Sequence, residues 1–127
     1  MDRKKAIREK HESGYNCAQA VLCSFADKLS VSEDELFRIA EGFGGGIGGT
    51  GGMCGAVSAM VMAAGLNKSG GTQKIGTKPQ TAALVRELLA EFKEKNGTLV
   101  CRELKTEKKR SCIECMEDAA EILEKII

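Results

Sequence analysis

The chain has 127 residues, of which 29% are charged, and a formal net charge of only +1. This length fits one domain with a hydrophobic core of its own, so we expect residues 1–127 to form a single cysteine-containing helical domain. A net charge so close to zero offers no overall field for binding nucleic acid, and no apolar run is long enough for membrane insertion.

Apolar residues recur at helical spacing along most of the chain. The predicted helices, in chain order, span residues 2–12, 17–29, 33–41, 53–66, 79–95 and 112–127. Four segments have the form of a capping box at a helix start, namely residues 16–19, 32–35, 77–80 and 111–114. No segment alternates polar and apolar residues with period two. We therefore predict an all-α fold, a compact bundle of about five to six helices with a glycine-rich loop.

The apolar positions also predict the buried side of each helix. The side chains expected to face the core are Leu36, Phe37, Ile39, Ala40, Leu84, Leu88, Leu89, Phe92, Met116, Ala119, Ala120, Leu123, Ile126 and Ile127. Residues 53–66 are almost wholly apolar, which predicts a helix buried on most sides and leaves open a homodimer. Residues 67–77 predict a loop, and Gly97 predicts the end of the helix at 79–95.

The chain contains six cysteines, at positions 17, 23, 54, 101, 112 and 115. No apolar stretch follows the charged N-terminus, so we expect no signal peptide and a cytoplasmic location. In that compartment cysteines are more often catalytic, redox-sensing or metal-binding than disulfide-bonded. Cys23 lies inside an apolar helix and is expected to be a small buried hydrophobic residue.

Three cysteines lie where a helix is predicted to begin. Cys17 and Cys112 each follow a predicted cap residue, and Cys54 opens an apolar stretch. A thiol in the first helical turn faces unpaired amides and the positive end of the helix dipole, which favours the thiolate. The basic residues of segment 102–110 either form a solvated surface or lower the thiol pKa of Cys101 and Cys112. Thiolates attack disulfides and bind metals, so these positions predict thiol chemistry.

Residues 42–52 form a glycine run that contains the spacing GxGxxG. A dinucleotide fingerprint needs a strand before this motif, and here a helix precedes it. We expect instead that the glycines allow positive φ angles and close backbone approach, with amides that favour a thiolate or cluster sulfides. The glycines assigned to this cofactor-binding role are Gly44, Gly45, Gly46, Gly52 and Gly55.

Cys112 and Cys115 form a CxxC pair whose side chains share one helix face. A zinc ribbon needs a second such pair, a thioredoxin-like site needs a βαβ unit, and a c-type haem site needs a histidine after the second cysteine. The sequence predicts none of these. The basic segment at 102–110 is short and lacks aromatic residues, so it does not predict nucleic-acid binding.

The order of these motifs resembles a family of redox-active proteins labelled C_GCAxxG_C_C for its cysteine spacing. The matching segments are residues 14–21, 42–46, 54–58, 101–104 and Cys112 before an amphipathic helix. The family cysteines fall on Cys17, Cys54, Cys101 and Cys112, whereas Cys23 and Cys115 are additional and inherit no role. The closing glycine of the central motif is Ala59 here, which is still small enough for a close helix contact.

The resemblance implies a small helical fold similar to part of the split-Soret cytochromes, whose haem-attachment motif is missing here. Two functions stay open for Cys17, Cys54, Cys101 and Cys112. They could catalyse thiol–disulfide exchange or electron transfer with a redox partner, with Cys17 or Cys54 attacking and Cys101 or Cys112 resolving. They could instead act as metal ligands for an iron–sulfur cluster, or less readily for zinc. A structural or interaction protein with incidental cysteines is the third hypothesis.

Overall fold

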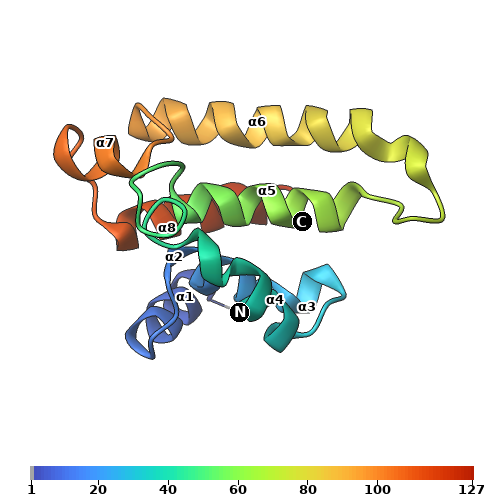
Figure 1. Ribbon diagram of the computed structural model, residues 1–127, viewed down its shortest axis with the longest axis horizontal. Coiled ribbons are helices and arrows are strands. Elements are labelled where there is room, and N and C mark those ends of the chain that lie inside the picture. The colour runs from blue at the N-terminus through green and yellow to red at the C-terminus, as the bar shows by residue number, and fades with distance from the viewer. Residues whose placement is uncertain (1) are drawn as a thin grey trace.

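The computed structural model describes residues 2–127 and is predominantly helical (Figure 1). The α-helices among these residues are α1 (Arg3–Glu12), α2 (Cys17–Cys23), α3 (Ala26–Leu29), α4 (Glu33–Ala40), α5 (Gly55–Lys68), α6 (Lys78–Asn96), α7 (Cys101–Thr106) and α8 (Cys112–Glu124). Two short 3-10 helices are η1 (Glu41–Phe43) and η2 (Ile75–Thr77). The described residues form no β-strand, and the predicted all-α fold is confirmed.

The helices pack in three layers (Figure 1). Helix α6 lies on one side, α5 and α8 form the middle, and α1, α2 and α4 cover the other side. The middle helices join the two outer layers, since α5 and α8 each pack against α6 and against α2. The core therefore runs through the whole bundle, and its fully buried side chains include Phe25, Leu36, Met60, Phe92 and Met116.

The prediction of one helix over residues 17–29 is wrong, because the chain bends at Ser24 and divides into α2 and α3. The Ser24 hydroxyl donates to the carbonyl of Ala20 at 2.7 Å, and the Ser24 carbonyl accepts from Arg3 at 2.6 Å. A side chain of α1 thus bonds the carbonyl that the next helical turn would use. Arg3 also lies over the Phe25 ring, 4.6 Å from its centre, which fixes the bend against α1.

The predicted helix caps form to different extents. Asn16 and Ser111 make complete capping boxes, with a bond in each direction between the cap residue and the third helical residue. Ser32 accepts the amide bond but lacks the reciprocal one. Thr77 makes no cap bond, because η2 leads directly into α6 and Thr77 is not extended as a cap residue normally is. Its hydroxyl accepts from the amide of Gly70 instead.

Most side chains predicted to face the core are buried or partly buried, but Ile39 is 58% exposed. Helix α4 turns Leu36 and Ala40 fully inward, and Phe37 is partly buried beside them. Helix α4 is only about two turns long, and its buried face does not include Ile39, which faces solvent. The prediction that Ile39 faces the core is therefore wrong.

The two ends of the segment between α5 and α6 also differ slightly from the prediction. Helix α5 continues to Lys68, and η2 begins at Ile75, so the loop is shorter than residues 67–77. Gly97 ends α6 with a φ of 83°, as predicted from its lack of a side chain.

Within residues 2–127, no helix combines the length and the apolar character needed to cross a membrane.

Replacing Ser111 by alanine should weaken α8, because alanine cannot accept the bond from the Glu114 amide at 3.1 Å. We expect the free energy of unfolding to fall by about 1 kcal/mol, measured by urea denaturation followed by circular dichroism. Ser111→Asp keeps an acceptor at the cap and serves as the control, with stability close to that of the parent. An equal loss in both variants would show that the cap bond is not the cause.

Candidate functional site

Five cysteines from different parts of the chain meet at one end of the bundle. The residues that line this cavity are Cys17, Cys54, Gly55, Cys101, Leu104, Lys105, Arg110, Cys112 and Cys115. The cavity has a volume of about 10 Å³, which is room for roughly one water molecule. The structure thus brings the four cysteines selected from the sequence to one place and adds Cys115 to them.

Each of the four selected cysteines stands at the start of a different helix. Cys17, Cys101 and Cys112 are the first residues of α2, α7 and α8, and Cys54 is the cap residue of α5. Figure 1 shows the beginnings of these helices gathered at the end of the bundle where the glycine loop lies. Since Cα–Cβ bonds in a helix tilt toward its N-terminus, thiols at these positions extend beyond the helix ends into the shared space.

Gly55 allows the starts of α2 and α5 to come together. A Cβ atom on Gly55 would lie 3.1 Å from the amide nitrogen of Ala18 and 3.3 Å from Cβ of Cys17. It would also lie 3.1 Å from the carbonyl oxygen of Phe43. A larger residue would require these neighbours to move by a few tenths of an ångström, so the glycine favours the close approach of Cys54 and Cys17.

Gly46 and Gly52 hold the start of α7 against the loop. The amide of Cys101 donates to the carbonyl of Gly52 at 2.6 Å. A Cβ atom on Gly46 would lie 2.7 Å from Cβ of Cys101 and 2.6 Å from the Gly52 nitrogen. On the other side of the loop, the amide of Cys54 donates to the carbonyl of Leu99 at 2.8 Å. These contacts tie the starts of α5 and α7 to each other.

The glycine loop follows a left-handed path. Positive φ angles occur at Gly45, Gly46, Ile47, Gly48, Gly49 and Gly51. Several loop amides bond to carbonyls of the same loop, for example Gly48 to Gly42 at 2.8 Å and Gly52 to Gly46 at 2.8 Å. The Gly45 amide donates to the Cys17 sulfur, and Gly44 packs against the Asn16 side chain. The loop therefore acts more by fixing the helix starts than by offering an open set of amide donors.

Cys112 and Cys17 form the first thiol pair. Cys112 is half-buried, whereas the other four cavity thiols are buried. The Cys17 thiol donates to the Cys112 sulfur. This bond, helped by the charge of Lys105, lowers the pKa of Cys112 to about 5, although burial acts in the opposite direction. The same bond, together with burial, raises the pKa of Cys17. The expectation that both thiols ionise is therefore wrong for Cys17, because two adjacent sulfurs share one proton.

Cys54 and Cys115 form the second pair, deeper in the bundle. Cys54 is 5% exposed and Cys115 is 3% exposed. The bond from the Cys115 thiol, with further help from the amides of Val57 and Ala56, lowers the pKa of Cys54 to about 7 in spite of burial. The bond and the burial raise the pKa of Cys115, so this pair too holds one proton. No role for Cys115 follows from the family pattern, although its CxxC spacing predicts that it shares a helix face with Cys112.

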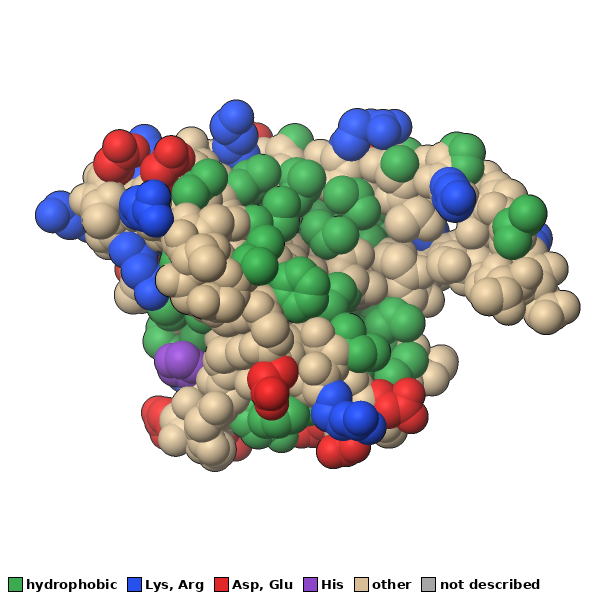
Figure 2. All heavy atoms as spheres, in the orientation of Figure 1, with side chains coloured by type: hydrophobic (Ala, Val, Ile, Leu, Met, Phe, Trp, Pro, Cys, Tyr) green, Lys and Arg blue, Asp and Glu red, His purple; other side chains and the backbone are tan. Residues whose placement is uncertain are grey.

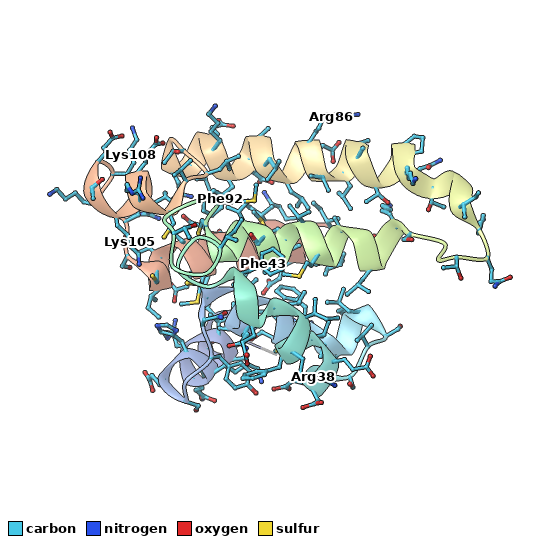
Figure 3. All side chains as sticks on the ribbon, in the orientation of Figure 1. Arg38, Phe43, Arg86, Phe92, Lys105 and Lys108 are labelled. Atoms are coloured by element: carbon cyan, nitrogen blue, oxygen red, sulfur yellow. The ribbon has the colours of Figure 1, made fainter. Side chains whose placement is uncertain are left out.

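The basic segment affects the two neighbouring cysteines differently. Lys105 is exposed on α7 near the start of α8 (Figure 3), and the charge of Cys112 raises the pKa of this lysine. Figure 2 shows further lysine and arginine side chains around α7, mixed with acidic ones. Burial raises the pKa of Cys101 and outweighs the opposing charge of Lys105. The second of the two readings of this segment, a lowered thiol pKa, therefore holds for Cys112, whereas at Cys101 the charge acts in that direction but burial prevails.

Arg110 braces the wall of the cavity. Its Nε donates to Asn96 at 2.9 Å, and its two terminal nitrogens donate to Glu114 at 2.8 Å and to Asp118 at 2.7 Å. These bonds connect the end of α6 with the first turns of α8.

Cys23 lies outside the cavity. Its thiol donates to the carbonyl of Glu33 at 3.7 Å, and burial raises its pKa to about 11.

All six cysteines are free thiols in the structure. Within the described part of the chain, no group of three or more His, Cys, Asp or Glu side chains has the arrangement of a metal-ion site. The site is thus defined by two thiol pairs and Cys101 around one small cavity.

The fold and the site together define a helical bundle centred on a cluster of cysteines. This chain belongs to the family described as "Putative redox-active protein (C_GCAxxG_C_C)", whose model matches residues 15–126. A protein of Archaeoglobus fulgidus, described as uncharacterized, is 30% identical over an alignment of 122 residues, and the match covers 84% of this chain and 81% of the relative. No solved structure matches the chain at a significant level.

Gly46→Ala should destabilise the protein more than Gly48→Ala. Both positions have positive φ angles, which cost alanine roughly 1–2 kcal/mol, but a Cβ on Gly48 meets no atom within 4 Å. A Cβ on Gly46 meets Cys101 and the Gly52 backbone, and we expect a further loss of roughly 1–3 kcal/mol. Urea denaturation of both variants measures the difference. Equal losses would show that the loop does not press against α7.

In the reduced protein, iodoacetamide should modify Cys112 before the other thiols. Since its pKa is lowered to about 5, Cys112 stays a thiolate above that pH, and the rate should fall as the pH drops through about 5. Lys105→Met should move this midpoint upward, because it removes a cation near the thiolate. Peptide mass spectrometry at each pH gives the rate for each cysteine.

The matched control is Arg86→Met, which removes an exposed charge on the outer side of α6 (Figure 3). It should leave the pH midpoint of Cys112 unchanged. A midpoint near the ordinary thiol value of about 8.5 in the parent protein would contradict the lowered pKa.

Proposed function

We propose that this protein carries out thiol–disulfide exchange, with Cys112 as the attacking cysteine and Cys17 as the resolving one. The observation that supports this proposal is the pairing of a half-buried thiol with a buried thiol in the same cavity. A redox-active dithiol needs one sulfur that a substrate can reach and a second sulfur within reach of the first. The description of the family as redox-active agrees with this chemistry.

The exchange reaction balances without another cofactor. The Cys112 thiolate attacks one sulfur of a substrate disulfide, forms a mixed disulfide and releases the first substrate thiolate. Cys17 then gives up its proton to that leaving thiolate and attacks the sulfur of Cys112. The second substrate thiolate leaves and takes a proton from water, and a Cys17–Cys112 disulfide remains. The substrate disulfide gains two electrons, and the protein dithiol loses two.

The electrostatics of the pair suit these two roles. The lowered pKa keeps Cys112 ionised at neutral pH, as an attacking thiol must be, and also makes it a good leaving group when the disulfide is reduced again. Cys17 keeps its proton until Cys112 enters the mixed disulfide and loses its negative charge. At that moment the largest cause of the raised pKa of Cys17 disappears, although burial remains, and Cys17 becomes better able to attack. This order of events differs from the roles expected from the sequence, which had Cys17 or Cys54 attacking and Cys101 or Cys112 resolving.

An iron–sulfur cluster held by Cys17, Cys54, Cys101 and Cys112 is the second candidate, because thiolates from separate helices are a suitable donor set. The size of the cavity favours the dithiol instead. A volume of about 10 Å³ admits roughly one water molecule, whereas a cluster brings several iron and sulfide atoms. The thiols would have to separate before a cluster could bind.

An aromatic disulfide such as 5,5′-dithiobis(2-nitrobenzoate) tests the proposal, because each substrate thiolate released is coloured. The reduced parent protein should show a fast phase in which Cys112 reacts and Cys17 resolves the adduct. Cys17→Ser should stop at the mixed disulfide and keep one nitrothiobenzoate group on Cys112, visible by mass. Cys112→Ser should lose the fast phase.

The matched control is Cys23→Ser, because Cys23 is a buried cysteine outside the cavity and should not change the fast phase. A Cys112–Cys115 disulfide in place of Cys17–Cys112 would overturn the role given to Cys17. Brown anaerobic preparations that contain iron and sulfide would overturn the dithiol in favour of the cluster.

A further inference from the structure

We infer that Cys54 and Cys115 form a second, buried redox pair, which takes over the disulfide from Cys17 and Cys112. This inference rests on the proposed thiol–disulfide exchange and adds a role for Cys115. It concerns a residue outside the set of four that the family pattern assigns. The protein would then store two disulfides, one at the accessible pair and one in the interior.

The first support is the position of the four sulfurs. Both pairs line the same small cavity, which has a volume of about 10 Å³. Cys112 and Cys115 lie three residues apart on α8, so one helix carries one member of each pair on the same face. Cys54 reaches the cavity from the start of α5 and meets Cys115 there.

The second support is that each pair is sensitive to the charge of the other. The charge of Cys112 acts on both Cys54 and Cys115, and the charge of Cys54 acts on Cys17. Such mutual effects agree with the position of both pairs around one cavity.

The transfer step balances by itself and needs no additional oxidant. The Cys54 thiolate attacks the Cys112 sulfur of the outer disulfide, and Cys17 leaves as a thiolate. Cys115 then transfers its proton to Cys17 and attacks the Cys54 sulfur, which releases Cys112 as a thiolate. One disulfide has moved inward, and the outer pair is again a thiol and a thiolate. The outer pair can then reduce a second substrate disulfide, which gains two electrons while Cys17 and Cys112 form their disulfide again.

The inner pair has no direct access for a bulky substrate. Both of its thiols are at most 5% exposed, whereas Cys112 is half-buried. An aromatic disulfide must therefore react through Cys112. Oxidation of Cys54 and Cys115 becomes a consequence of the outer exchange, and the two events can be separated experimentally.

The test extends the reaction with 5,5′-dithiobis(2-nitrobenzoate) to completion on the full chain. The reduced parent should release about two coloured thiolates per chain in the fast phase and about two more as the inner pair takes over the disulfide. Peptide mapping of the product should find both Cys17–Cys112 and Cys54–Cys115 disulfides. The matched control, Cys23→Ser, should give the same total, because Cys23 lies outside the cavity.

Two variants report on the transfer step itself. Cys54→Ala removes the inner attacker, and release should stop at about two thiolates. Cys115→Ala removes the inner resolving thiol and should accumulate a Cys54–Cys112 disulfide, which mapping identifies. Circular dichroism of each variant checks that the helical fold is retained. The disulfide map of the parent protein tests the inference without any substitution.

The outcomes separate this inference from the function on which it rests. A parent protein that forms Cys17–Cys112 but keeps Cys54 and Cys115 as free thiols would overturn the inner pair and leave the proposed exchange intact. Oxidation of the inner pair at an unchanged rate in Cys112→Ser would overturn the transfer from the outer pair. A parent protein without any Cys17–Cys112 disulfide would overturn the proposed function itself.

Discussion

The close approach of four helix starts is the constraint on which the rest of this site depends. It is helped by the absence of side chains at Gly46, where a Cβ would collide with Cys101 and the Gly52 backbone, and at Gly55, where a Cβ would be tightly packed. Hydrophobic packing of α5 against α2 supplies the driving force, and the glycines determine how near the helices can come. The thiols meet because the backbones that carry them are allowed to meet.

Close packing of thiols creates an electrostatic problem, and the structure solves it by proton sharing. Several thiolates in one small, buried cavity would repel each other and lose hydration. Each pair instead holds one thiol that donates to one thiolate, so the pKa values of its members move in opposite directions. Lys105 adds a positive charge at the accessible side. The helix starts favour thiolates, but the proton sharing decides which of the sulfurs ionises.

Local signals in the sequence were enough to predict the helices and the cysteines that begin them. Capping residues such as Asn16 and Ser111 act within one turn, so their effect can be read from neighbours in the chain. The break at Ser24 could not be read in this way, because it depends on Arg3, which is far away in sequence. The exposure of Ile39 depends likewise on which neighbours α4 meets in the folded bundle.

The candidate site shows the same division between local and long-range information. The position of Cys112 at a helix start was evident, and so was the face it shares with Cys115. The partners of these two cysteines were not, because Cys17 and Cys54 reach them through contacts between separate helices. Which thiol keeps the proton depends on those contacts, so the ionisation of Cys17 was predicted in the wrong direction.

Helix α8 gives the site its internal order, because it carries one sulfur of each pair on a single rigid element. The complete capping box at Ser111 fixes the first turn of this helix, and Arg110 ties that turn to α6. The amides of Cys54 and Cys101 are bonded to backbone carbonyls as well. With the backbones held on all sides, an exchange of disulfides within the cavity requires rotation of cysteine side chains and little else. A cysteine side chain turns about one torsion between staggered positions, so a rigid bundle is compatible with the exchange of sulfur–sulfur bonds.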